Sequence, residues 1–284
     1  MPYDGIAMTA EQRARSLGVH LVLIAYSALA VGPLLLVVMN SFKARNAIFG
    51  APLALPDAST FSLIGYEKVF RASNILTYFS NSLIVTLVSM SLVLLFGAMA
   101  AWALTEYRFR GSTALALFLS IGIMVPIRLG SVAILNMMRS AGLNDTLTAL
   151  ILIYVAQGLP MSIFILSEFI QQIPKDLRDA ARCDGVPETR IFLEVIAPLL
   201  RPAIATVAVF TIVPIWNDLW FPLILTSSDK THTVTLGVQQ FLGQYITDWN
   251  SVLAALSMAI LPVVAIYVIL SRQLIAGLTS GAVK

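Results

Sequence analysis

Few side chains of this sequence could carry out chemistry, and the familiar catalytic patterns are missing. Its 284 residues include only two histidines, His20 and His232, and one cysteine, Cys183. No His-Glu-x-x-His cluster, zinc-ligand spacing or Gly-x-Ser-x-Gly turn occurs. The phosphate-binding pattern Gly-x-x-x-x-Gly-Lys-Ser/Thr is also absent, which excludes an ATPase site of that kind. We therefore expect no catalytic residues, no metal site and no cofactor-binding site in this chain.

The most informative segment runs from Pro174 to Pro202. Its first half predicts a short helix from Asp176 to Asp184, with acidic residues in the first turn, where the helix dipole favours them. At helical spacing, one face of this helix carries Leu177, Ala180, Ala181 and Asp184. The two alanines make that face shallow, so another protein could approach it closely.

Turn-forming residues divide this segment into two helices. Gly185 suits the left-handed position that ends a helix, and Pro187 suits the first turn of the next one. Pro198 should stop the second helix, and Pro202 should start the following apolar run. Two interpretations remain open at this point: a docking element for another protein, or an amphipathic connector that packs only against its own chain.

Two charges lie inside apolar runs, where ionisable residues are costly. Counted from the same end of their runs, Arg128 and Asp218 lie at similar depths, roughly 22 to 24 Å at 1.5 Å per residue. They could form an ion pair that holds two helices together, or they could line a solute path. If Asp218 does not neutralise Arg128, that arginine would favour an anionic solute, such as an acidic sugar.

Three neighbouring side chains are weaker candidates for the same path. Gln157 and Asn217 could hydrogen-bond a sugar or an adjacent helix, and we favour the adjacent helix. Trp216 fits an aromatic belt at the membrane surface, with stacking on a sugar ring as the alternative.

The composition indicates that lipid surrounds most of these residues. Hydrophobic residues make up 58% of the chain and charged residues 12%, whereas soluble domains have about 25% charged residues. Six stretches approach or exceed the roughly 20 residues that span a bilayer. They cover residues 17–39, 78–104, 113–138, 147–170, 202–226 and 252–270. All but one contain proline, which bends helices and suggests a bundle around a path. The predicted fold is therefore all-α, a single transmembrane domain over residues 1–284.

The distribution of basic residues predicts the orientation. With the N-terminus inside, 11 lysines and arginines fall in cytoplasmic segments and 6 in outer ones. Both termini are then cytoplasmic, and so is the loop of residues 174–201 between the fourth and fifth spans.

The same loop resembles a known motif. Asp179-Ala180-Ala181, then Asp184-Gly185, then Pro198 and Pro202 resemble the EAA motif of permeases from binding-protein-dependent ABC importers, with Asp179 in place of the usual glutamate. The chain is further similar to the carbohydrate branch, in particular to the smaller permease of the maltose importer. The stretches that carry this likeness are Asn40–Lys43, Asn81–Leu83, Tyr107–Gly111, Trp216–Asp218 and Gly281–Lys284.

The resemblance implies a function and a set of partners. The loop would insert as a coupling helix into an ATP-binding subunit, so that Asp179, Ala180, Ala181, Asp184 and Gly185 lie at that interface. The partners would be a second homologous permease, two ATPase subunits that hold ATP and magnesium, and an extracytoplasmic solute-binding protein. The complex would import a sugar or sugar derivative across a bacterial inner membrane. The outer loop from about Ser227 to Asn250 would face the binding protein.

An alternative class is a stand-alone, ion-coupled secondary transporter or channel. It would need a coupling-ion site of its own, and the predicted spans contain few carboxylates for one. A membrane enzyme is the third class, and it lacks the catalytic groups named above.

Overall fold

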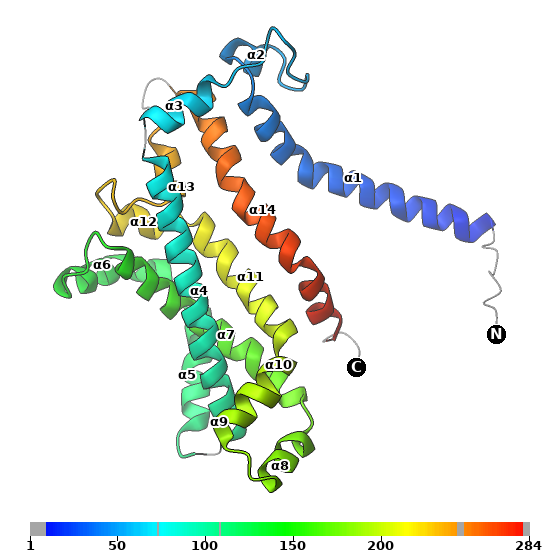
Figure 1. Cartoon of the computed structure of the whole chain (residues 1–284), viewed down its shortest axis with the longest axis vertical. Helices are drawn as coiled ribbons and strands as arrows, with labels where there is room; N and C mark the ends of the chain where they lie inside the picture. The colour runs from blue at the N-terminus through cyan, green and yellow to red at the C-terminus, as the bar shows by residue number, and fades with distance from the viewer. Residues whose placement is uncertain (1–9, 73, 108, 243–246, 281–284) are drawn as a thin grey trace. The chain divides into compact units, whose positions relative to one another are not determined.

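The computed structural model describes residues 10–72, 74–107, 109–242 and 247–280. Throughout this described part the regular structure is helical, which confirms the predicted all-α class. The chain divides into two compact units, one formed by Met1–Ala72 with Phe241–Met258 and the other by Ser73–Gln240 with Ala259–Lys284. Helix α14 (Trp249–Ser280) contributes to both (Figure 1).

The first unit contains the long helix α1 (Ala10–Ser41), the short helices α2 (Arg45–Gly50) and α3 (Ile64–Ala72), and the start of α14. Two of its buried polar residues hold the turn that follows α1. Asn40 Nδ2 donates to the Pro52 carbonyl at 2.9 Å, and Lys43 Nζ donates to the Ala51 carbonyl at 2.9 Å. Asn250 Nδ2 in turn donates to the Lys43 carbonyl at 2.7 Å. These bonds satisfy buried polar groups and so fix the course of the loop.

The second unit is built around the long helices α4 (Ile75–Glu106) and α7 (Leu147–Gln172). The remaining elements of the unit follow in chain order: α5 (Ser112–Met124), η1 (Ile127–Gly130), α6 (Ser131–Ser140), α8 (Lys175–Cys183), α9 (Glu188–Arg190), η2 (Ile191–Ile196), α10 (Ala197–Leu199), α11 (Arg201–Asn217), α12 (Trp220–Leu225) and α13 (Val234–Gln239). A core of apolar side chains joins α4 and α7 to the segment 191–207, and it includes Val93, Ala101, Leu166, Ile170, Ile191, Ile196 and Leu200.

Four of the predicted spans each fall inside one helix, namely α1, α4, α7 and α14. The parts of these helices that are long and apolar enough to cross a membrane are Arg15–Ser41, Ile75–Glu106, Leu147–Gln172 and Trp249–Val268. The predicted range 113–138 instead contains two helices that meet at a bend of 87°. Pro126 stands at this break, where it has no amide proton to continue the helix. The predicted range 202–226 is also interrupted, because α11 ends at Asn217 and α12 begins at Trp220.

Small residues bring α4 and α7 into close contact. A Cβ atom on Gly97 would lie 2.1 Å from Ser162 Oγ and 2.9 Å from Ser162 Cβ. A Cβ atom on Gly158 would lie 2.8 Å from a methyl group of Val93. All three distances are shorter than van der Waals contact, so these glycines are required for the observed approach, as is common between helices in membranes.

Replacing Gly97 with leucine should therefore force α4 and α7 apart. We expect a loss of stability of about 1 to 3 kcal/mol or more, the usual cost of overpacking a filled interface. The measurement is the thermal unfolding midpoint of the purified protein. Gly32→Leu is the matched control, because a Cβ there meets nothing within 4 Å. Equal midpoints for the two variants would contradict the close packing.

Candidate functional site

Helix α8 (Lys175–Cys183) ends in a tight turn at Asp184 and Gly185, both of which are exposed. Gly185 has a φ of 75°, the left-handed conformation predicted for it. Its amide donates to the Arg182 carbonyl at 3.0 Å, and the Val186 amide donates to the Ala181 carbonyl at 3.0 Å. This pair of bonds is the Schellman arrangement, which satisfies the last carbonyl groups of a helix. The chain then turns sharply into α9.

The residues of the predicted coupling motif are partly exposed to solvent. Asp179, Ala180, Asp184 and Gly185 are exposed, whereas Ala181 is half-buried and packs against the apolar core. Pro198 lies within the short helix α10 rather than after its last residue, and Pro202 lies in the first turn of α11 as predicted. Of the face predicted to be shallow and accessible, Leu177, Ala180 and Asp184 are exposed, whereas Ala181 faces the core.

A group of charged side chains that the sequence did not single out attaches α8 to the end of α4. Both carboxylate oxygens of Glu106, the last residue of α4, accept hydrogen bonds from arginines of α8, one from Arg178 and one from Arg182. Arg182 also donates to Glu188 at 2.7 Å and to Asp179 at 3.1 Å. The hydrogen bond from Arg182 lowers the pKa of Glu188, so this carboxyl stays ionised at neutral pH.

One signal in the sequence could have pointed to these contacts. Arg178 and Arg182 are four residues apart on a short helix, a spacing that places both on one face. A carboxylate facing them is the natural complement. Glu106 ends an apolar run, but the sequence alone does not distinguish it from an acidic residue in solvent.

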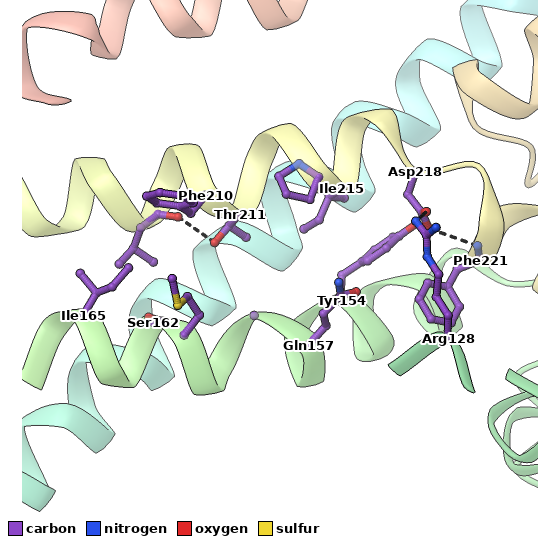
Figure 2. A pocket seen from close by; sticks show the side chains of 14 residues that line it. Arg128, Tyr154, Gln157, Ser162, Ile165, Phe210, Thr211, Ile215, Asp218 and Phe221 are labelled. Carbon is purple, nitrogen blue, oxygen red and sulfur yellow. Dashed lines mark hydrogen bonds and ion pairs between the residues drawn. The ribbon is translucent and has the colours of Figure 1, made fainter. Parts of the chain in front are cut away.

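A cavity of about 210 Å³ lies between α7 and α11. It is closed at one end by Arg128 of η1 and Phe221 of α12 (Figure 2). Polar groups in its lining come from Arg128, Tyr154, Gln157, Ser162, Thr211 and Asp218. Apolar side chains provide much of the rest, among them Met161, Ile165, Phe210 and Ile215. A mainly apolar cavity with a few convergent polar groups is typical of a small-molecule site.

Asp218 is the centre of the polar cluster at one end of this cavity. Its Oδ1 accepts from Arg128 Nη2 at 3.1 Å, and its Oδ2 accepts from the Tyr154 hydroxyl at 2.9 Å. The backbone amides of Trp220 and Phe221 donate to the same carboxylate at 3.3 and 3.1 Å. The Asp218 side chain is 7% exposed, whereas that of Arg128 is 66% exposed. The structure thus forms the ion pair that was one of the two interpretations.

The other predicted residues are not all at the cavity. Gln157 lines it. Asn217 does not, because its amide donates to the Val213 carbonyl of its own helix at 2.9 Å. Trp216 is only 2% exposed, packs on Phe79 and donates to the Ala259 carbonyl at 3.0 Å. Its burial rules out both the surface belt and sugar stacking in this conformation.

A second carboxylate fixes the loop that follows α12. Asp145 has a φ of 59°, and its Oδ1 accepts from the amides of Ser227 and Ser228 at 2.8 and 3.1 Å and from the Thr231 hydroxyl. Burial opposes ionisation of Asp145, but these donors outweigh it and lower its pKa. The start of the loop is therefore held in one place.

Among the described residues, no group of three or more histidine, cysteine, aspartate or glutamate side chains is placed to hold a metal ion. The features that stand out are instead several long apolar helices, the pair bent at Pro126, and a second pair, Glu188–Leu199 with Arg201–Asn217, bent by 76°. The charged loop that contains α8 leads into this second pair. Such an arrangement defines a multi-pass membrane protein.

Comparison with known proteins gives the family. The chain belongs to the family described as binding-protein-dependent transport system inner membrane component, which matches residues 93–279. It is 32% identical over 267 residues to the diacetylchitobiose uptake system permease protein NgcG of Streptomyces coelicolor, covering 93% of this chain and 88% of that protein. It is 32% identical over 264 residues to the trehalose transport system permease protein SugB of Mycobacterium tuberculosis, covering 90% and 93%.

A solved structure shares the fold. The crystal structure of a bacterial ABC transporter involved in the import of the acidic polysaccharide alginate contains a chain that superposes with a TM-score of 0.78. The match covers 94% of this chain and 99% of that chain at 18% identity, so it establishes the fold alone. The resemblance to carbohydrate ABC permeases is confirmed. The chain is an inner membrane component of a binding-protein-dependent transport system, and the relatives it is similar to are permease subunits rather than ATPase subunits.

Proposed function

We propose that this chain forms one half of the channel of an ATP-driven importer that takes up a neutral oligosaccharide. In this proposal six spans cross a bacterial inner membrane, with both termini and the loop 174–201 in the cytoplasm. The chain pairs with a second homologous permease and two ATPase subunits, which bind ATP and magnesium. A solute-binding protein outside the membrane delivers the sugar, and the loop that Asp145 holds after α12 lies on that side.

The observation that carries the proposal is the geometry of α8. The side formed by Ala180, Asp184 and Gly185 is exposed in the described part of the chain and can dock on an ATPase subunit, and the Asp179 carboxylate beside it accepts a hydrogen bond from Arg182. The opposite side is tied to α4 through Glu106. An element held in this way can receive a push from an ATPase and transmit it to the bundle. An amphipathic connector that packs only against its own chain would explain the side of α8 bound to Glu106. It would not explain why the other side of α8 is exposed and carries small side chains.

The choice of a neutral sugar rests on Asp218. The sequence predicted an anionic solute only if Arg128 were not neutralised, and Asp218 lies 3.1 Å from it. Relatives named for the transport of diacetylchitobiose, of melibiose, raffinose and stachyose, and of trehalose support the same choice. A stand-alone, ion-coupled carrier is less well supported, because Asp218 already has four donors within hydrogen-bond distance and is poorly placed to bind a coupling ion.

Co-purification tests the proposal. The chain is tagged at its native expression level, solubilised gently, and isolated with whatever accompanies it. We expect an ATP-binding subunit and a second, related permease, and the associated binding protein should bind neutral oligosaccharides more tightly than uronate-containing ones. Recovery of the chain alone, from membranes in which it is stable, would overturn the importer proposal. Preference for uronates would overturn only the choice of solute.

A further inference from the structure

The acidic residue at the end of α4 joins two helices that differ in character. Glu106 closes a long apolar helix, and its two carboxylate oxygens accept from two different arginines of α8. One oxygen is bound by Arg178 and the other by Arg182. A bridging carboxylate of this kind restrains both the position and the rotation of α8 relative to α4, because each arginine constrains a different turn.

Arg178 makes the contact with Glu106 strong. Its side chain is 3% exposed, and its guanidinium lies 5.8 Å from the centre of the Trp102 ring. A charge buried to this extent requires an opposite charge nearby, since its own hydration is lost. The carboxylate provided by the described residues around Arg178 is that of Glu106. Any displacement of α8 that separated the two would leave a buried charge unpaired.

Apolar packing contributes little to the attachment of α8. The helix has nine residues, and of its apolar side chains Ala181 packs against the core, whereas Leu177 is 46% exposed and Ala180 is also exposed. Arg182 extends the charged contacts to α9, because it binds Glu188, whose other oxygen accepts from the Tyr107 hydroxyl at 3.1 Å. Charged and polar contacts therefore provide most of the attachment to the end of α4.

We propose that Glu106 is a positioning residue for energy coupling, which makes α8 and α4 move as one body. The proposal rests on the function proposed above, in which α8 docks on the ATPase. Helix α4 packs along α7 through Val93, Ala101 and their partners Leu166 and Ile170. Helix α7 in turn supplies Tyr154 and Gln157 to the cavity. A displacement of α8 thus reaches the cavity wall through one ion-pair group and one packed helix interface.

Charge exchange provides the test. Glu106→Arg should place three positive side chains together and detach α8. The double variant Glu106→Arg with Arg178→Glu restores an ion pair with the opposite polarity. A carboxylate at position 178 would also lie four residues before Arg182 on the same helix, a favourable order for such a pair. Arg182 keeps Glu188 and Asp179 as partners in both variants.

The measurement uses the complete importer in proteoliposomes and records sugar uptake and ATP hydrolysis separately. Glu106→Gln, the mildest variant, should retain ATP hydrolysis while the sugar transported per ATP falls roughly tenfold, as expected when one contact of a coupled group is removed. The sugar transported per ATP should fall further in Glu106→Arg. The double variant Glu106→Arg with Arg178→Glu should recover most of the wild-type ratio. Glu194→Gln is the control, because Glu194 lies in the loop 174–201 that contains α8, is 67% exposed and has its ion-pair partner Arg190 at 3.9 Å.

A second readout separates attachment from transport. A spin label on the exposed Cys183, at the end of α8, should become more mobile in Glu106→Gln and return to the wild-type spectrum in the exchanged double variant. Wild-type uptake per ATP in Glu106→Gln, or a double variant no better than Glu106→Arg, would overturn the proposal. A wild-type complex without ATP-driven uptake would instead overturn the proposed function, and the label would still report whether Glu106 holds α8.

Discussion

Replacing Asp218 with asparagine should destabilise the protein more than any other single change at the cavity. The Asp218 carboxylate accepts four hydrogen bonds, two of them from backbone amides, and is almost fully buried. An asparagine presents an NH₂ group in place of one oxygen, so that donors would face donors. Buried hydrogen bonds to charged groups are each worth about 1.5 to 3 kcal/mol. We expect a total loss of about 3 kcal/mol.

Arg128→Gln should behave differently although it breaks the same ion pair. The Arg128 side chain is 66% exposed, so water replaces most of what the pair provides. Exposed ion pairs contribute about 0 to 1 kcal/mol. Tyr154 and the two amides would continue to stabilise the Asp218 carboxylate. The predicted asymmetry between the two variants follows from burial and from the number of hydrogen bonds.

Thermal unfolding of the purified complex and sugar uptake together measure this asymmetry. Asn217→Ala is the control, because the Asn217 side chain is exposed and bonds only within its own helix among the described contacts. Equal destabilisation by Asp218→Asn and Arg128→Gln would contradict the view that the carboxylate organises the cluster. Loss of uptake in Arg128→Gln, with stability unchanged, would show that Arg128 acts on the solute and not mainly as a partner of Asp218.

The pairing of Arg128 with Asp218 could be anticipated from depth alone. Both residues interrupt apolar runs at similar distances from the same end, and lipid leaves a charge few other partners. The participation of Tyr154 could not be anticipated, because a tyrosine in an apolar run fits equally well in a lipid-facing position. Trp216 shows the same limit. Its neighbours in sequence suggested the membrane surface, yet its indole is buried against Phe79.

Proline accounts for one helix break but does not by itself locate the others, because Pro33, Pro160, Pro214 and Pro262 lie inside continuous helices. Pro126 marks the 87° bend, since it cannot donate the hydrogen bond that would continue the helix. No proline marks the end of α11 at Asn217. There the backbone of Asp218 is extended, and its carboxylate accepts hydrogen bonds from the amides of Trp220 and Phe221. Glu106 was missed for a related reason. Its role depends on arginines 72 and 76 residues later in the chain, a separation that local patterns do not cover.

Gly185 is the position where a single substitution should most affect the loop itself. Gly185→Asp would add both backbone strain and side-chain bulk. In the structure a Cβ at Gly185 meets nothing within 4 Å, so the bulk has no effect inside this chain. The strain remains, because the left-handed conformation at a φ of 75° costs an ordinary residue about 1 to 2 kcal/mol.

Comparing three substitutions at Gly185 separates these two effects. Asparagine and aspartate both tolerate the left-handed conformation better than alanine does. If strain alone matters, Gly185→Asn and Gly185→Asp should retain more of the uptake than Gly185→Ala does. If the open side of α8 docks on an ATPase subunit, as proposed, bulk matters at that interface, and Gly185→Asn should also fail to assemble while Gly185→Ala assembles better.

We expect the second pattern, because Gly185 continues the shallow surface formed by Ala180 and Asp184. Recovery of the ATPase subunit with each tagged variant, together with sugar uptake per ATP, distinguishes the two outcomes. Val186→Ala, at the half-buried position next to Gly185, controls for a general loosening of the turn, since it leaves both backbone and open surface unchanged. Assembly of Gly185→Asn at the wild-type level would mean that the interface lies elsewhere on the loop, and the exposed side of α8 would lose its proposed role.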